Sequence, residues 1–213
     1  MSKHSLTSRH PIARPRQVST DDILTVAREV FLELGPAATT TEIARRVGLS
    51  QAALFKRFGT KGDLLTAALK PPNEPPFLEV LATGPEDAPL APQLRRVGLA
   101  IAAFFRELIP CMAMLRATGV DHHKLLASYP VPPPVRAHMA LTGWLGRAKE
   151  MGRVRPNVDV ASAALVFLGA LQSRAFLTHL LGDAHTFAQD DATYIDHLVD
   201  VLCNGIHSEE HPS

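Results

Sequence analysis

The side chains best suited to recognise a polyanion lie in one short segment, residues 40–61. The amide of Gln51 can form two hydrogen bonds with the edge of an adenine, and Lys56 and Arg57 can bind guanine or a phosphate. A solvated charged face is the alternative interpretation of the two cations. Amide and guanidinium or ammonium groups are the side chains with which proteins contact bases and phosphates without covalent chemistry.

Elsewhere the sequence offers little for catalysis or metal binding. Asp121-His122-His123 resembles a metal cluster, but adjacent helix residues point roughly 100° apart, so a solvated turn is the favoured interpretation. Cys111 and Cys203 form no C-x-x-C pair, and no base is visible beside either. No signature of a serine hydrolase, a zinc protease or a nucleotide-binding loop occurs. We expect no catalytic residue, no cofactor and no metal; a small helical enzyme is the alternative.

Three residues predict that two short helices meet at a fixed angle. Ala44 is small where the first helix must touch the second, Gly48 can adopt a positive φ at the turn, and Leu54 can fill the corner. The first helix has the sequence of a capping box, formed by Thr39 and Glu42. We predict a helix-turn-helix here; a generic helical hairpin is the alternative.

The rest of the chain also has helical periodicity, so the predicted fold class is all-α. The expected helices span about residues 19–34, 40–47, 51–58, 61–69, 93–108, 111–118, 121–128, 135–151, 158–181 and 190–205. The predicted organisation is a flexible basic arm (1–18), a helix-turn-helix domain (19–70), a proline-rich linker (71–92) and a helical effector-binding and dimerisation domain (93–213).

Charge is distributed unevenly along the chain. Residues 1–70 carry eleven Lys/Arg against six Asp/Glu, whereas residues 71–213 carry eleven against fifteen. A basic first third is typical of a segment that meets a polyanion. The longest charge-free apolar stretch, residues 160–173, is too short to cross a bilayer, and no secretory signal is visible at the start. We therefore expect a cytoplasmic protein with no membrane partner.

Residues 23–69 closely resemble the N-terminal domain of TetR-type (TetR/AcrR) transcriptional regulators. The matching residues are Ile23, Ala27, Phe31, Gly35, Thr39, Ile43, Ala44, Gly48, Leu49, Ser50, Leu54, Phe55, Phe58, Lys61, Leu64 and Leu65. The run from Gly48 to Lys61 is the most specific part, and the remainder is similar only in being helical. Phe55 departs from the family, which usually has tyrosine there, so a hydroxyl contact with phosphate is lost.

The resemblance implies a homodimer that binds palindromic double-stranded operator DNA, acts as a repressor and is released by a small-molecule effector. The expected DNA-contacting residues are Thr40, Ser50, Gln51, Ala52, Ala53, Phe55, Lys56, Arg57 and Lys61. Ser50 has the competing role of a simple N-cap. Arg14 and Arg16 of the arm can enter the minor groove or belong to an untethered tail.

Two further sets of residues are expected in the C-terminal part. The dimer interface is predicted at Leu165, Leu168, Gln172, Ile195, Leu198, Val199 and Leu202. The effector pocket is predicted at Phe104, Phe105, Leu108, Met112, Leu115, Trp144, Leu145 and Phe167. Packing within one subunit is the alternative for both sets, and a DNA-binding protein without an effector is the alternative function.

Overall fold

The computed structural model describes residues 18–182 and 189–206. In these ranges the chain forms α1 (Thr20–Leu34), the 3₁₀ turn η1 (Gly35–Ala37), α2 (Thr40–Val47), α3 (Gln51–Phe58), α4 (Lys61–Leu69), α5 (Phe77–Ala82), α6 (Leu90–Ala117), α7 (His122–Ala127), α8 (Pro133–Glu150), α9 (Val160–Leu181) and α10 (Asp191–Asn204). No strand occurs in the described part, and the predicted all-α fold class is confirmed.

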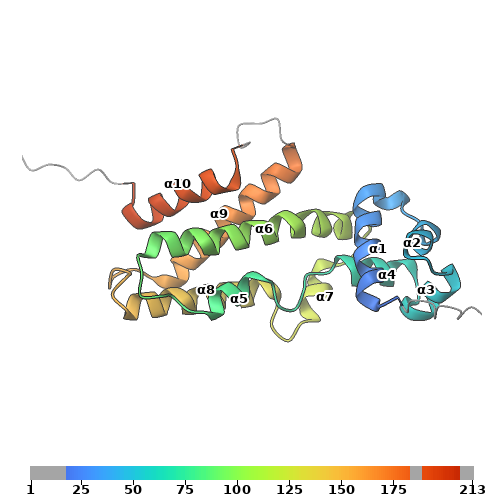
Figure 1. Cartoon of the computed structure of the whole chain (residues 1–213), viewed down its shortest axis with the longest axis horizontal. Helices are drawn as coiled ribbons and strands as arrows, with labels where there is room; N and C mark the ends of the chain where they lie inside the picture. Colours follow the sequence, from blue (N-terminus) through green and yellow to red (C-terminus); the bar gives the residue numbers. More distant parts are fainter. Residues whose placement is uncertain (1–17, 183–188, 207–213) are drawn as a thin grey trace, which may run out of the picture.

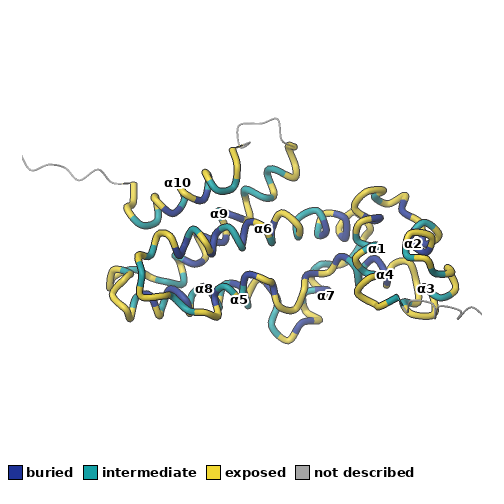
Figure 2. The backbone as a smooth tube through the Cα atoms, viewed as in Figure 1, coloured by how far each residue is buried: buried dark blue, intermediate teal, exposed yellow. Residues whose placement is uncertain are grey.

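The helices form a small head at one end and an elongated bundle at the other (Figure 1). Helices α1–α4 make the head, and α5, α6 and α8–α10 make the bundle, with α7 between them. Helix α6 contacts α9, α10 and α5 in the bundle and α1 and α4 in the head. Buried residues follow the sides of the helices that face one another (Figure 2). One long helix thus belongs to both parts.

The head has its own apolar core, to which α6 contributes. Ile23 and Phe31 of α1 are fully buried there, together with Leu64 of α4. Cys111 and Leu115 from the last turns of α6 belong to the same cluster. Since each buried side chain contributes roughly 1.5–3 kcal/mol, this contact holds α6 firmly to the head.

The predicted break at Pro110 is wrong. Residues 93–108 and 111–118, expected as two helices, are parts of the single helix α6, with Pro110 inside it. Proline removes one helical hydrogen bond, at a cost of roughly 3 kcal/mol. Burial of Phe105 in the bundle core and Leu115 in the head core, one on each side of the proline, outweighs that cost.

The segment at residues 71–92, predicted to be a linker, is packed against the bundle. It contains α5, which contacts α6 and α8 and buries Phe77 and Leu81. The hydroxyl of Tyr129 donates to the carbonyl of Pro71 at 2.6 Å. The prolines therefore guide the chain along the bundle rather than acting as a spacer.

By length and composition alone, α6 and α9 could each cross a membrane. The charge-free stretch at residues 160–173 extends into the 22-residue α9, so the expectation that it is too short is wrong for the whole helix. Both helices are packed here: α6 against head and bundle, and α9 against α6 and α8. Such packing is usual for the core helices of a helical bundle.

Candidate nucleic-acid interface

The corner between α2 and α3 is built by the three residues that the sequence indicates. Gly48 has φ 77° and ψ 31°, in the left-handed region where a side chain is strained. The N–H of Leu49 donates to the carbonyl of Ala44 at 2.9 Å and closes the end of α2. Ala44 and Leu54 are 4% and 1% exposed. The two helices are therefore locked at a fixed angle, as predicted.

The capping box predicted at the start of α2 is only half formed. The hydroxyl of Thr39 accepts from the N–H of Glu42 at 3.2 Å, as a cap requires. The Glu42 carboxylate does not return the bond; it accepts from Arg45 (2.8 Å) and Arg46 (2.7 Å). The hydrogen bond from Arg45, and then that from Arg46, lowers the pKa of Glu42 to about 2. The positive charges of Arg45 and Arg46 are thus paired with a carboxylate of the head.

Helix α3 presents the predicted reading residues to solvent. Gln51, Ala52 and Lys56 are exposed, Ala53 is half-buried, and Leu54 is the buried residue of the helix. Ser50 caps the helix, because its hydroxyl accepts from the N–H of Ala53 at 3.2 Å. The outer face of α3 is therefore available to enter a groove.

The side chain of Thr40 on α2 fixes the side-chain amide of Gln51 on α3 by a hydrogen bond. The Nε2 of Gln51 donates to the Thr40 hydroxyl at 2.7 Å, and Thr40 is only 7% exposed. The expected phosphate contact at Thr40 rests on the N–H groups at the start of α2, and it stays a prediction. The sequence interpretation missed this pairing, which crosses the helix-turn-helix over eleven positions.

The cations around α3 have different surroundings. Arg57 donates to the carbonyl of Val18 at 2.9 Å, and Lys61 donates to the carbonyl of Pro36 at 3.2 Å, which ties both to the head. The side chain of Lys56 makes no hydrogen bond or ion pair in the described part of the chain, so it is the cation most readily offered to DNA. The predicted arm contacts lie outside the described residues.

Phe55 is 41% exposed on the same helix. Single exposed apolar side chains are common on protein surfaces, so this exposure does not by itself indicate a partner. Its ring offers an apolar contact but no hydroxyl for a phosphate. The departure from tyrosine is thus visible at the surface.

The residues predicted to line one effector pocket are divided between several places. Four of them, Phe104, Phe105, Leu108 and Met112, line a cavity of about 330 Å³ between α6, α8 and α9, here named the proximal cavity. Leu145 and Phe167 line another cavity, of about 350 Å³, at the end of the bundle far from the head. Trp144 (1% exposed) lies in the bundle core and Leu115 (0% exposed) in the head core. Neither lines either of these two cavities, so an effector role for these two residues stays a prediction.

The predicted dimer residues also divide. On α10, Ile195 (0% exposed) and Val199 (5%) pack against α6 of the same chain; a Cβ added to Gly98 of α6 would lie 2.9 Å from Ile195. Leu168 of α9 is 6% exposed. These three predictions are wrong, because the residues already form the core of one subunit. Leu198 and Leu202 are half-buried against that core.

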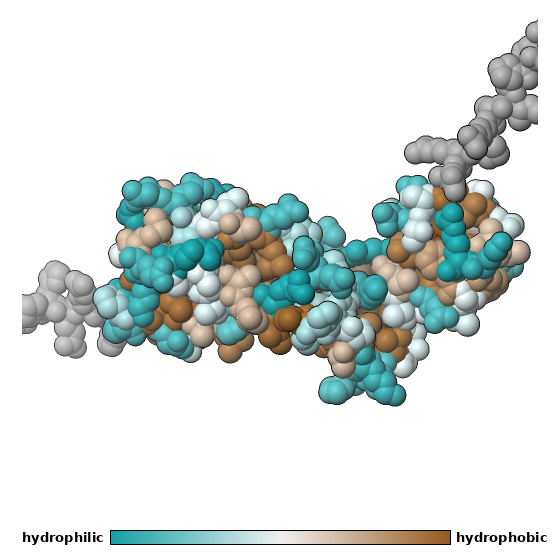
Figure 3. All heavy atoms as spheres, turned by 90° about the horizontal axis from the view of Figure 1, so that it is seen from below, coloured by the Kyte–Doolittle hydropathy of each residue, from teal (hydrophilic) through white to brown (hydrophobic). Residues whose placement is uncertain are grey.

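Other apolar residues of α9 face outward. Leu165 is 63% exposed, as the interface prediction requires, and Gln172 is exposed beside it. The sequence interpretation did not include Val166, Phe176 and Leu180, which are 55%, 51% and 64% exposed. Helix α9 is apolar on all sides, and that pattern could have shown that it has two faces to cover. In the view of Figure 3, hydrophobic residues form patches between hydrophilic residues on the surface of the bundle.

The chain is similar to known bacterial regulators in the sequence of its head and in its overall fold. Residues 23–68 match the family model of bacterial regulatory proteins, tetR family. The solved structure of the TetR family regulator PfmR from Thermus thermophilus is 24% identical, with a TM-score of 0.57 over 87% of this chain and 99% of that one. A putative TetR-family regulator from Mesorhizobium loti is 16% identical, with a TM-score of 0.68 over 84% and 92%.

A third similar structure holds a ligand. It is the transcriptional regulator FadR from Bacillus subtilis in complex with stearoyl-CoA, which is 18% identical, with a TM-score of 0.56 over 87% of this chain and 98% of that one. No curated protein matches the sequence with comparable significance. At these identities the structures establish the fold.

Proposed function

We propose that this chain, which has a tetR-family domain at residues 23–68 and the fold of TetR-family regulators, is a TetR-family transcriptional regulator that represses by binding palindromic operator DNA as a homodimer. The observation that carries the proposal is the outer face of α3. Gln51, Ala52 and Lys56 project to solvent from a helix fixed by Gly48 and Leu54. A rigid helix with an amide and a cation on its free face suits the major groove.

The residues of the head have distinct roles in this proposal. Gln51 reads adenine from an orientation that Thr40 sets in advance, Ala52 and Ala53 meet thymine methyl groups, and Lys56 binds guanine or phosphate. The contacts to the DNA backbone come from Ser50, Phe55, Arg57, Lys61 and the first turn of α2 at Thr40.

Operator binding should depend steeply on salt. We expect the affinity for a palindrome selected from random DNA to fall by about 10³–10⁵ between about 50 and 200 mM salt if each head neutralises several phosphates. Lys56→Ala should lower the slope of log affinity against log salt by about 2, roughly 1 for each subunit of the homodimer, if Lys56 binds phosphate. Gln51→Ala should weaken binding and relax the preference at one base pair of each half-site, by about 1–3 kcal/mol for each.

Thr40→Val is the matched control for Gln51. It removes the hydroxyl that holds the amide but keeps both the amide and the shape of the buried side chain. We expect a smaller loss of affinity than for Gln51→Ala and the same base preference. A salt-independent affinity for the selected DNA would overturn the proposed function.

The homodimer is proposed to form through the outward face of α9. The exposed apolar residues on this helix are Leu165, Val166, Phe176, Leu180 and Leu181. A symmetric pair of such faces would bury them and bring two heads to two half-sites. Covered in this way, α9 needs no membrane, in keeping with a cytoplasmic location.

The proximal cavity is the proposed effector site. Its lining residues include the polar His138 and Gln172 and no Asp, Glu, Lys or Arg, so it suits a neutral, mostly apolar molecule. Nε2 of His138 lies 2.9 Å from the carbonyl of Ala161; because a carbonyl only accepts, a neutral ring presents Nδ1 as an acceptor. FadR, which holds stearoyl-CoA, supports the idea that such a helical domain can bind a ligand.

Helix α6 would connect the effector to DNA. Met112 lines the proximal cavity, and Met114 and Leu115, two and three positions later, are buried in the head cluster. A ligand that prefers one position of α6 shifts the populations of head arrangements by its difference in affinity for them.

A thermal-shift series would separate an effector-controlled repressor from a DNA-binding protein without an effector. We expect neutral aromatic probes, such as 2-naphthol, to raise the melting temperature and to lower operator affinity. Leu108→Trp, which fills the proximal cavity, should abolish both effects while leaving operator binding in place. If 2-naphthol and related neutral probes leave the melting temperature unchanged, the effector-independent alternative is favoured.

A further inference from the structure

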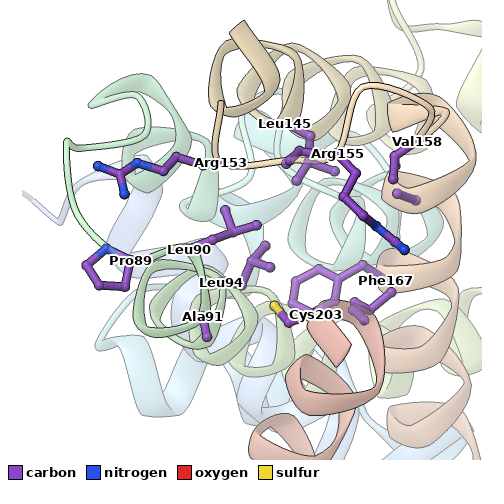
Figure 4. A pocket seen from close by; sticks show the side chains of 13 residues that line it. Pro89, Leu90, Ala91, Leu94, Leu145, Arg153, Arg155, Val158, Phe167 and Cys203 are labelled. Atoms are coloured by element: carbon purple, nitrogen blue, oxygen red, sulfur yellow. The ribbon is translucent and has the colours of Figure 1, made fainter. Parts of the chain in front are cut away.

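A second cavity lies at the end of the bundle far from the head. It has a volume of about 350 Å³ and shares no lining residue with the proximal cavity. The first turns of α6, the loop between α8 and α9, α9 itself and the end of α10 surround it (Figure 4). We call it the distal cavity. Its walls are mostly apolar, with Leu90, Leu94, Leu145, Val158 and Phe167 among the lining residues.

The charged side chains of the distal cavity are two arginines. Arg153 and Arg155 line it from the loop between α8 and α9, and no carboxylate from the described part of the chain lines it. In Figure 4, Arg153 lies on the side of Pro89, and Arg155 lies on the opposite side, with its guanidinium near Phe167. The cavity therefore has apolar walls and a positive edge.

Arg155 differs from most arginines of the bundle. Arg153 pairs with Asp87, and carboxylates also pair with Arg95, Arg96, Arg106, Arg136 and Arg174. The side chain of Arg155 makes no hydrogen bond or ion pair in the described ranges 18–182 and 189–206. It is exposed, so a molecule from solvent can reach it. Its five N–H donors are available to an incoming group.

A guanidinium beside an apolar cavity selects an amphipathic anion. Its planar donors match the two oxygens of a carboxylate, which can accept a pair of parallel hydrogen bonds. Leu94 and Phe167 offer apolar area to a hydrocarbon chain, at roughly 25 cal/mol per Å² buried. A cation would be repelled, and a small inorganic anion would leave the apolar walls unused.

We propose that the distal cavity binds a monocarboxylate with an apolar chain, with the carboxylate on Arg155 and the chain between α6 and α9. This is a ligand site separate from the proposed effector site. Its test does not depend on operator binding, so the two proposals can fail independently.

The test compares octanoate with octan-1-ol, which has the same chain without the charge, on the full-length protein by calorimetry. Octanoate should bind more tightly. Arg155→Gln should weaken octanoate about tenfold, as expected for a charge-assisted hydrogen bond, and leave octan-1-ol unchanged. Arg116→Gln is the matched control: Arg116 is exposed on α6 and lines neither cavity, so octanoate binding should stay as it is.

A second readout comes from Cys203, which lines the distal cavity and is half-buried, whereas Cys111 is 1% exposed. Octanoate should slow the alkylation of Cys203. Because burial raises the pKa of this thiol, the labelling is best done at about pH 9. Ala91→Trp, an exposed position at the rim, should reduce octanoate binding without affecting the fold.

Three results would overturn the proposal. The first is equal affinity for octanoate and octan-1-ol. The second is an Arg155→Gln protein that binds octanoate as the unchanged protein does. The third is a pair of findings: Leu108→Trp no longer binds octanoate, and octanoate does not slow the alkylation of Cys203 in the unchanged protein. Together they would place the ligand in the proximal cavity.

Discussion

Phe176→Glu should convert the protein to a monomer and reduce operator affinity by at least about 1000-fold, towards that of non-specific binding. Phe176 is 51% exposed on the outward face of α9, where a symmetric partner would meet it. In a homodimer the substitution occurs twice across the axis, so it places two like charges in an apolar contact. A monomer presents one head to one half-site and loses the gain from simultaneous binding. Light scattering and fluorescence anisotropy measure the two effects.

Met151→Glu is the matched control for this experiment. Met151 is 42% exposed at the end of α8, so the same charge is added to a surface outside α9. This variant should stay dimeric and keep its operator affinity. If Phe176→Glu is dimeric at the same concentrations, the outward face of α9 is not the interface, and another surface must cover it.

The head could be predicted almost completely from the sequence because local rules determine it. Gly48 is the residue that a left-handed turn demands, and Ser50 and Thr39 are caps whose partners lie three positions away. Leu54 fills a corner between helices that are neighbours in the chain. Interactions of this kind have short sequence separations, so their spacing is readable without a structure.

The failures concern competition between distant elements. A proline such as Pro110 usually ends a helix. Here the buried cores on both sides of Pro110 keep α6 one continuous helix. The apolar stripe of α10 predicts a contact with a partner subunit, whereas Gly98 of α6 leaves room for Ile195 inside the same subunit. An apolar stripe shows that one face of a helix is buried, but it does not show whether the same chain or a partner subunit buries it.

The binding residues show the same division. Exposure of Gln51 on α3 follows from helical periodicity, whereas its hydrogen bond to Thr40 depends on the crossing angle of α2 and α3. Similarly, aromatic residues of α6 and α8 suggest a pocket, but only the packing decides that Phe104 lines a cavity and Trp144 lies in the core. Cavities are what packing leaves over, so no local pattern encodes them.

Leu54→Ala should lower the free energy of unfolding by about 2–5 kcal/mol and abolish tight operator binding near physiological temperature. Leu54 is the buried residue of α3, so its loss leaves a cavity under the helix that carries Gln51 and Lys56. Urea unfolding measures the stability, and anisotropy with operator DNA measures the binding at temperatures below the melting transition.

Leu141→Ala separates the two effects of that change. Leu141 is 0% exposed in the bundle core, so its truncation should cost a similar free energy while α3 keeps its support. Operator affinity at a temperature where both variants are folded should therefore fall for Leu54→Ala and stay near its original value for Leu141→Ala. Leu54→Met, which conserves volume, should cost less than about 1.5 kcal/mol. Equal operator affinities for the two alanine variants would mean that DNA is held elsewhere than on α3.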